Sequence, residues 1–370
     1  MTPTPLLYQL AVAGVQQLVP YVPGKPIEEL QRELGLEQVI KLASNENPLG
    51  PSKKALIAMQ KVLPELALYP DGSGFNLKKT LAKKCGVESA QITLGNGSNE
   101  ILELVARAFL APGLNAVFSR HAFAVYPLVT QAAGATAVVA PALHYGHDLQ
   151  AIRQRVNAQT RVVFIANPNN PTGTLLPQSH LEDFIKSLPA TCVCVLDEAY
   201  EEFVQRKGEQ KAIDWLGQCP NLVITRTFSK AYGLAGLRIG YCLSSPDMAD
   251  ILNRVRQPFN NNALALAAAE AALDDSEHLQ NTIKNNTLGM KQLTEGFKNL
   301  GLSWIPSAGN FVAVDLSEPA YPVYEGLLRK GVIVRPVANY DMPNHLRISI
   351  GTPLENNLFL QALTEYLNNV

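Results

Sequence analysis

The sequence predicts an α/β fold, with a large domain built on a mainly parallel sheet of seven strands and a smaller α+β domain. Seven short β-rich apolar runs alternate with helical patterns between about residues 88 and 243. The runs are continuously apolar, which is typical of strands buried on both faces of a parallel sheet. Beyond about residue 246 the pattern becomes helical and then ends in a compact α+β tail. A chain of 370 residues is long enough for two or three domains.

Residues 1–49 are predicted to form an N-terminal arm that packs with the small domain. Its start reads as an amphipathic helix and not as a signal peptide, because no Lys or Arg precedes Lys25. The stretch PYVPGKP, residues 20–26, is predicted to be extended because its three prolines exclude regular structure. A helix around residues 28–33 and a short strand lead to the polar turn SNENP, whose amides are suited to hold backbone or ligand.

Residues 50–257 are predicted to form the large domain. Ser52 is the expected N-cap of a helix that ends at Val62, and YPDGSG, residues 69–74, is a loop. Ligands of such sheets sit at the carboxyl ends of the strands, so the polar residues that end each strand are the first candidates for a site. The predicted strands are 91–95, 116–119, 136–140, 161–167, 192–198, 222–227 and 237–243.

Residues 258–370 are predicted to form the small α+β domain. Helical spacing of apolar residues covers 248–256 at the end of the large domain and then 263–300. The tail that follows has predicted strands near 311–316, 332–334 and 346–350 and a closing helix from about residue 354.

The composition excludes several classes of partner. With 31 basic and 32 acidic residues, the net charge of −1 gives no field that would favour nucleic acid or an acidic membrane. The five cysteines form no C-x-x-C motif, which argues for a reducing cytoplasm and against a thiolate metal site. No stretch has the length of an uninterrupted transmembrane span. We therefore expect a cytoplasmic protein without a metal, acting on small molecules.

The stretch TFSKAYGLAGLRIGY, residues 227–241, contains the most distinctive pair of side chains. A lysine such as Lys230 attacks a carbonyl only when it can lose its proton, which partial desolvation beside other cations favours. Arg238 and the Ser229 hydroxyl offer donors suited to a phosphate. The pair suggests a phosphorylated carbonyl cofactor, pyridoxal 5′-phosphate. The competing interpretation is two surface cations around a glycine-rich loop.

Two predicted strands end in residues suited to the ring of the same cofactor. Asp197 terminates the apolar run CVCVLD, and a buried carboxylate is costly unless a cation such as a protonated pyridine nitrogen meets it. Asn170 in ANPNNPTG precedes a proline, which excludes helical geometry and allows its amide to face a phenolic oxygen. The alternative for Asp197 is a cap on a neighbouring helix.

Two further strand ends offer a phosphate cradle and a stacking ring. Gly97, Ser98 and Asn99 open a helix, where backbone N–H groups bind anions. Phe123 and Tyr126 follow another strand, and either ring suits stacking on a flat cofactor or filling of the core. Each signal has a structural alternative, but together they supply every contact that one cofactor requires.

The order NPNNPTG, DEAY and then SK with an arginine eight positions later resembles the class I and II, fold-type-I aminotransferases. The resemblance covers essentially the whole chain. Within this family, LVPYVPGKP, SNENPLGP and YPDGSG resemble the histidinol-phosphate aminotransferases.

The resemblance implies a role for each cofactor residue. Lys230 would attach the cofactor and move the proton at the substrate α-carbon, and Asp197 would keep the pyridine nitrogen protonated. Tyr200, with Asn170, would bind the ring oxygen. Phe123 would stack on the ring, where many relatives have tyrosine. The phosphate would be bound by Gly97, Ser98, Asn99, Ser229, Arg238 and, from the other subunit of a homodimer, Tyr69.

The resemblance also implies a substrate site formed by Tyr21, Asn47, Arg335 and Arg347. Both arginines and the Tyr21 hydroxyl would meet the phosphate of histidinol phosphate, and Arg347 would bind the α-carboxylate of glutamate. The implied function is transamination between histidinol phosphate and 2-oxoglutarate in histidine biosynthesis, with an aromatic amino acid aminotransferase, or activity on both substrates, as the alternative.

Two other classes of protein fit the sequence less well. A non-catalytic regulator that binds pyridoxal phosphate would need an appended DNA-binding domain, and only the short arm precedes the first motif. A nicotinamide oxidoreductase would need G-x-G-x-x-G, and GNGSNE has Glu100 in place of the third glycine.

Overall fold

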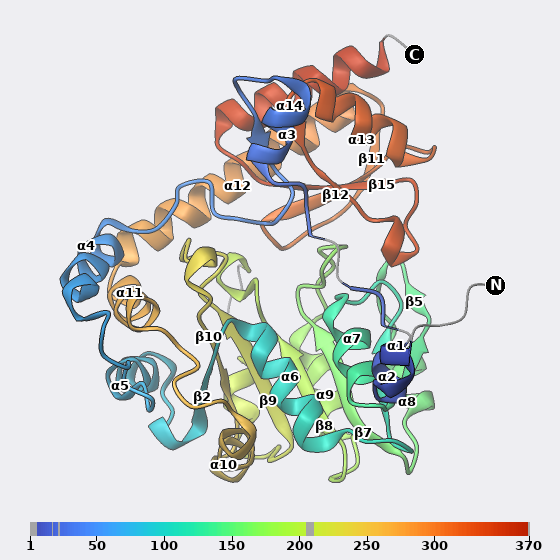
Figure 1. Cartoon of the computed structure of the whole chain (residues 1–370). Coiled ribbons are helices and arrows are strands. Elements are labelled where there is room, and N and C mark those ends of the chain that lie inside the picture. Colours follow the sequence, from blue (N-terminus) through green and yellow to red (C-terminus); the bar gives the residue numbers. More distant parts are fainter. Residues whose placement is uncertain (1–5, 17, 21–22, 205–210, 369–370) are drawn as a thin grey trace.

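The computed structural model describes residues 6–16, 18–20, 23–204 and 211–368. Its larger part is a seven-stranded sheet between layers of helices, and a smaller part lies above the edge where the parallel strands end (Figure 1). All seven predicted strands are confirmed, in the spatial order β2-β10-β9-β8-β7-β3-β4. Their bounds are β2 Ile92–Gly95, β3 Asn115–Ser119, β4 Thr136–Ala140, β7 Thr160–Ala166, β8 Val193–Asp197, β9 Leu222–Thr227 and β10 Gly240–Leu243.

The sheet is parallel except at one side. β9, β8, β7, β3 and β4 run parallel, whereas β10 is antiparallel to both β9 and β2. Alternate strand residues enter two separate cores, as the two-residue period of a strand requires. In β7, for example, Val163 packs on one side and Phe164 on the other.

Helices cover both faces of the sheet (Figure 1). One core contains residues of α6, α7 and α10, and the other contains residues of α4, α5, α8, α9 and α11. The helices are α4 Lys53–Val62, α5 Phe75–Cys85, α6 Ser98–Phe109, α7 Val125–Ala132, α8 Leu149–Arg155, α9 Gln178–Lys186, α10 Pro246–Val255 and α11 Ala263–Leu273. A short hairpin, β5 Ala142–Leu143 and β6 Gly146–His147, follows β4. The Ser52 side chain accepts the N–H of Ala55, so the predicted cap of α4 is confirmed.

The smaller part is an antiparallel sheet with three helices. The strand order is β11-β12-β15-β14, and α12, α13 and α14 pack against this sheet. The bounds are β11 Ser303–Ile305, β12 Phe311–Asp315, β14 Arg335–Pro336, β15 His345–Ser349, α12 Ser276–Asn299, α13 Ala320–Arg329 and α14 Pro353–Leu367.

Residues 27–42 join this smaller part, whereas α2 (Ala13–Gln16) packs against α7 of the larger part. β1 (Ile40–Lys41) pairs in parallel with β13 (Val332–Ile333), and Leu42 is buried in the same core. α3, Ile27–Leu34, lies beside them. By contrast α11, which follows the predicted domain limit at residue 257, packs in the core of the large sheet. The predicted domain limits stay a prediction.

Two predicted helices are each divided in the structure. The N-terminal arm contains α1 (Leu6–Leu10) and α2 (Ala13–Gln16) in place of one amphipathic helix. The run predicted for 263–300 breaks between α11 and α12, because the side chain of Asp275 accepts the N–H of His278 and starts a new helix. Among the described residues, no helix has the length and apolar character needed to cross a membrane.

Candidate active site

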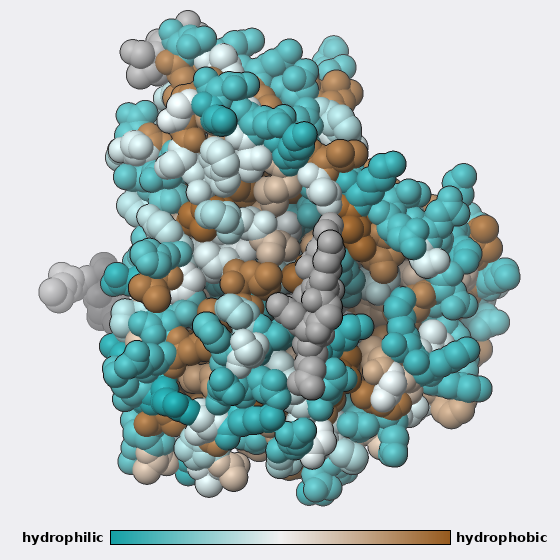
Figure 2. Space-filling model, turned by 180° about the vertical axis from the view of Figure 1, so that it is seen from behind, coloured by the Kyte–Doolittle hydropathy of each residue, from teal (hydrophilic) through white to brown (hydrophobic). Residues whose placement is uncertain are grey.

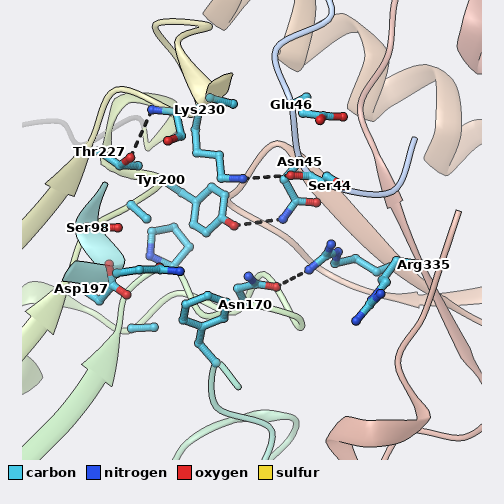
Figure 3. Close-up of a pocket in the computed structure, with 18 of the residues that line it drawn as sticks. Ser44, Asn45, Glu46, Ser98, Asn170, Asp197, Tyr200, Thr227, Lys230 and Arg335 are labelled. Atoms are coloured by element: carbon cyan, nitrogen blue, oxygen red, sulfur yellow. Dashed lines mark hydrogen bonds between the residues drawn. The ribbon is translucent and has the colours of Figure 1, made fainter. Parts of the chain in front are cut away.

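The candidate site is a cavity of about 270 Å³ where the carboxyl ends of the large sheet meet the small sheet. Its walls come from the SNENP turn, the start of α6, the loops that follow β3, β7, β8 and β9, and the strand pair β14–β15. Figure 3 shows Lys230, Tyr200, Asn170 and Asp197 around one space, with Arg335 on the opposite side. Strand ends thus gather side chains that are far apart in the sequence.

Lys230 lies in the loop between β9 and β10. Its Nζ donates to the carbonyl oxygen of Ser44 at 2.9 Å. Burial, followed by the nearby Arg347 guanidinium, lowers the pKa of Lys230 from 10.5 to about 7, against the opposing effect of Glu46. At neutral pH much of this amine is therefore unprotonated and able to act as a nucleophile or base.

Asp197 is the last residue of β8 and is 5% exposed. Its oxygens accept hydrogen bonds from the Tyr126 hydroxyl at 2.9 Å and the Thr225 hydroxyl at 3.0 Å. Burial raises the pKa of Asp197 above its usual range, and these two hydrogen bonds oppose the rise. No Lys, Arg or His of the described residues lies within 4.0 Å of its carboxylate. The carboxylate is thus held in a fixed orientation and suited to a cationic ring nitrogen.

The start of α6 and the Arg238 loop form an anion cradle. Arg238 donates from Nη1 to the Ser229 Oγ at 3.3 Å. Gly97 has a φ of 76°, and a Cβ at this position would come within 2.5 Å of the Arg238 guanidinium. Only glycine permits this close approach, which brings Arg238 to the first N–H groups of a helix. The first N–H groups of a helix have no partner within the helix, so they are suited to bind an anion.

Tyr200 and Asn170 also line the cavity. The Tyr200 hydroxyl accepts a hydrogen bond from Asn45 Nδ2 at 2.9 Å, and burial raises the pKa of Tyr200 to about 12. Asn170 Oδ1 accepts from Arg347 Nη1 at 2.5 Å (Figure 3). A neutral hydroxyl and an amide N–H are both available as donors to an oxygen on the cavity side.

The two arginines of the small sheet are register partners. Arg335 in β14 lies directly opposite Arg347 in β15, and opposite residues of an antiparallel pair project from the same face. Arg347 is 7% exposed and also donates to the carbonyl oxygen of Ala43 at 2.6 Å, whereas Arg335 is half-buried. The cavity therefore has one wall with two adjacent positive charges.

The structure brings most of the predicted site residues together. Lys230, Asp197, Tyr200, Asn170, Ser98, Asn99, Phe123, Ser229, Arg238, Arg335 and Arg347 all line the cavity, and Gly97 shapes it. Asn47 does not line it; its Nδ2 donates to the carbonyl oxygen of Ala231 at 2.9 Å and so supports the loop that carries Lys230. Tyr69 lies outside the cavity, and Tyr21 lies outside the described residues.

Several residues of the site are not among those predicted from the sequence. The sequence suggests the Tyr126 ring only for stacking on a cofactor or for filling the core, but its hydroxyl donates to Asp197. Thr225 holds the other Asp197 oxygen, and its position two residues before the end of a predicted strand was an available signal. Asn45 and Ser44 belong to the SNENP turn, whose amides the sequence marks as suited to hold backbone or ligand, but their partners Tyr200 and Lys230 are set by tertiary contacts.

These residues fit pyridoxal 5′-phosphate. Its aldehyde matches the Lys230 amine, whose pKa is lowered. Its ring nitrogen matches the buried Asp197 carboxylate, which has no cation within 4.0 Å among the described residues. Its phosphate matches the cradle at Gly97, a space that a Cβ would fill. Phe123 supplies an aromatic ring in the same cavity. The two arginines lie on the remaining wall.

The sequence matches the family described as Aminotransferase class I and II over residues 37–363. It is 62% identical over 360 residues to histidinol-phosphate aminotransferase 2 of Pseudomonas fluorescens, covering 97% of each chain. It is 61% identical over 360 residues to the protein of the same name from Pseudomonas aeruginosa, covering 97% of this chain and 98% of that one.

The fold is similar to the crystal structure of histidinol-phosphate aminotransferase from Sinorhizobium meliloti in complex with pyridoxal 5′-phosphate. The TM-score is 0.90 at 31% identity, and the match covers 97% of each chain. The chain therefore belongs to the class I and II aminotransferases, enzymes that depend on pyridoxal phosphate, and within them to the histidinol-phosphate aminotransferases.

Proposed function

We propose that this enzyme transfers an amino group between histidinol phosphate and 2-oxoglutarate, giving imidazole-acetol phosphate and glutamate, in histidine biosynthesis. The observation that carries the proposal is the pair Arg335 and Arg347, side by side on one wall of the cavity that contains Lys230. Two guanidinium groups match a phosphate dianion, which neither glutamate nor an aromatic amino acid presents at its side chain. The high identity to relatives with this name supports the same substrate.

In this proposal the residues around the cofactor ring act on the reacting atoms. Pyridoxal phosphate, when bound, supplies the aldehyde that takes the amino group and a ring that withdraws electrons from the substrate α-carbon. Lys230 Nζ removes the α-proton, for which a pKa of about 7 is well matched to neutral pH. The Asp197 carboxylate keeps a positive charge at the ring nitrogen, and Asn170 and Tyr200 orient the ring oxygen.

The other residues bind and position. Ser98, Asn99, Ser229 and Arg238 hold the cofactor phosphate in the cradle shaped by Gly97. Arg347 binds the α-carboxylate of glutamate and, with Arg335, the phosphate of histidinol phosphate. The two substrates therefore occupy the same wall in turn, as a ping-pong exchange requires.

The choice between substrates is tested by measuring kcat/KM for histidinol phosphate and for phenylalanine. We expect histidinol phosphate to be preferred, and Arg335→Ala to lower its kcat/KM about 10- to 100-fold while phenylalanine is unaffected, because one charged hydrogen bond to the phosphate is lost. Arg329→Ala, which removes an exposed arginine of α13, is the matched control. A higher kcat/KM for phenylalanine would identify the protein as an aromatic aminotransferase, and an equal loss for both donors would contradict the role of Arg335 in binding the phosphate.

We also propose that the enzyme is a homodimer whose sites are shared. Tyr69 is 83% exposed, stacks on Phe259 with ring centroids 4.7 Å apart and does not line the cavity of its own chain. Hydrophobic side chains interrupt the polar surface over α4 and α5, on the right in Figure 2. The exposed apolar residues of this region are Leu56, Ile57, Leu63, Leu66, Leu68 and Phe75. Such a patch supports burial against a second copy.

Mixed dimers test this arrangement. Lys230→Ala and Tyr69→Ala subunits are each expected to be impaired as homodimers. A mixed dimer, purified with two different tags, contains one site with both an intact Lys230 and its partner's Tyr69. It should regain about half of the wild-type activity. Mixed dimers no more active than the two homodimers would show that Tyr69 acts within its own chain or not at all.

A cytoplasmic location is supported by the cysteines. All five are free, and Cys192, Cys194, Cys219 and Cys242 are buried. We expect full activity in strong reductant, and loss of activity on reduction would contradict the assignment.

A further inference from the structure

The segment Arg256–Asn262, RQPFNNN, connects α10 to α11 and runs beside β2 (Figure 1). None of its residues lines the cavity. Yet its three consecutive asparagines each bind a different part of the phosphate cradle or its supports. This concentration of side-chain to backbone hydrogen bonds in one connection distinguishes it from an ordinary linker.

Asn260 binds the turn that precedes α6. Its Nδ2 donates to Glu100 Oε2 at 2.6 Å and to the carbonyl oxygen of Leu94 at 3.3 Å. The same Glu100 oxygen accepts the backbone N–H of Asn96 at 2.5 Å, and Asn96 Nδ2 returns a bond to the carbonyl oxygen of Asn260 at 3.2 Å. Asn96, Glu100 and Asn260 therefore form a small ring of hydrogen bonds that joins the turn to the segment.

The next two asparagines extend this connection. Asn261 Nδ2 donates to the carbonyl oxygen of Gly95 at 2.8 Å, at the start of the same turn. Asn262 Nδ2 donates to the carbonyl oxygen of Leu237 at 3.1 Å, the residue before Arg238. Both components of the cradle, the start of α6 and the arginine loop, are thus held by adjacent residues.

Glu100 explains why the turn needs this support. It is an acidic residue in the first turn of α6, beside the N–H groups that bind a phosphate dianion. Its two hydrogen bonds direct the carboxylate to Asn96 and Asn260, outside the helix. Without Asn260, the carboxylate would be free to accept the N–H groups that the phosphate needs.

The other side of the segment holds the loop that carries Tyr69. Arg256 donates to Asn260 Oδ1 at 2.6 Å and to the carbonyl oxygen of Gly72 at 3.1 Å. Phe259 stacks on the Tyr69 ring, and a Cβ at Gly72 would come within 3.2 Å of the Phe259 ring. Asn260 thus lies between the cradle of its own chain and the tyrosine that points away from it.

We infer that Asn260 is a positioning residue that ties the phosphate turn of one site to the Tyr69 loop that completes the partner's site. The inference rests on the proposed function, since it takes the cradle as the cofactor phosphate site and Tyr69 as a contribution across the dimer. Asn260 does not line the cavity. It acts by fixing Glu100 and, through Arg256, Gly72.

The first test measures cofactor affinity. We expect Asn260→Ala to raise the Kd of the apo-enzyme for pyridoxal phosphate about tenfold, because the turn loses its hydrogen bonds. Asn253→Ala is the matched control, since Asn253 binds the same Arg256 side chain at 2.9 Å from α10 but does not contact the cradle. Equal affinity of wild type and Asn260→Ala overturns the inference. A wild-type chain that does not bind pyridoxal phosphate overturns the proposed function instead.

A second variant keeps the test valid if Asn260→Ala does not fold. Glu100→Gln retains an acceptor for the Asn96 N–H and removes the charge beside the phosphate. It should bind pyridoxal phosphate at least as tightly as the wild type. A large loss of affinity would show that the Glu100 charge itself is required, which contradicts the role given to Asn260.

The link to the partner's site is tested by a double-mutant cycle. Asn260→Ala and Tyr69→Phe should each weaken cofactor binding, and the double variant should lose less than the product of the two single effects, because the first change already displaces the tyrosine. Fully multiplicative effects would overturn the coupling between the two loops.

Discussion

The two walls of the cavity are built in different ways. The wall from the large sheet consists of single residues that end separate strands or start loops, among them Asp197 and Lys230, and burial moves the pKa of each away from its usual value. The wall from the small sheet consists of one pair of register partners, Arg335 and Arg347. The residues of the first wall suit the chemical steps that all amino donors share. The two arginines of the second wall suit the binding of one donor in preference to another. Changes in the first wall should therefore act equally on every donor.

The largest effect is expected for Lys230→Ala. Loss of the amine removes both the covalent attachment of the cofactor and the base at the α-carbon, so turnover should fall by at least about 10⁴-fold with every donor. The visible absorbance of the lysine-bound cofactor should disappear as well. An unchanged visible spectrum would refute the role of Lys230.

Asp197→Asn is expected to have the next largest effect. The amide cannot hold a positive charge at the ring nitrogen, so kcat should fall about 10²- to 10³-fold, as for removal of one preorganised electrostatic contact. The loss should be the same for glutamate and histidinol phosphate. A loss confined to one donor would break the division between the two walls.

The smallest effect concerns pH. Because the pKa of Lys230 is lowered to about 7, the amine is protonated below this pH and neutral above it. The rate at which apo-enzyme takes up pyridoxal phosphate, followed by absorbance, should rise with pH through about 7 and then level off. A rate that continues to rise toward pH 10 would indicate an ordinary lysine.

The sequence was most informative where local pattern decides structure. Continuously apolar runs located the seven strands, and polar residues at their ends located Lys230, Asp197 and Asn170 in one cavity. Contacts between distant segments could not be read in the same way. Asn45 contacts Ser349 and Tyr200, which lie 304 and 155 positions further along the chain, so its place in the cavity depends on tertiary packing.

Helix ends and the orientation of loop side chains could not be predicted from the sequence either. The run at 263–300 has helical spacing throughout, but the side chain of Asp275 starts a new helix within it. Tyr69 and Asn47 occur in loops whose composition suggests a site, yet neither lines the cavity of this chain. Composition identified the loops but not the direction in which their side chains point.

The antiparallel pairing of β10 has a consequence for how the enzyme can change. Thr227 at the end of β9 and Gly240 at the start of β10 are register partners, so the chain between them leaves the sheet and returns at the same level. Lys230 and Arg238 both lie on this closed loop, and the aldehyde and phosphate of the cofactor are separated by a fixed covalent distance. With the roles proposed for Lys230 and Arg238, the length of this loop must match the distance between the aldehyde and the phosphate. An insertion here should therefore be tolerated far less than one in the surface connections elsewhere in the fold.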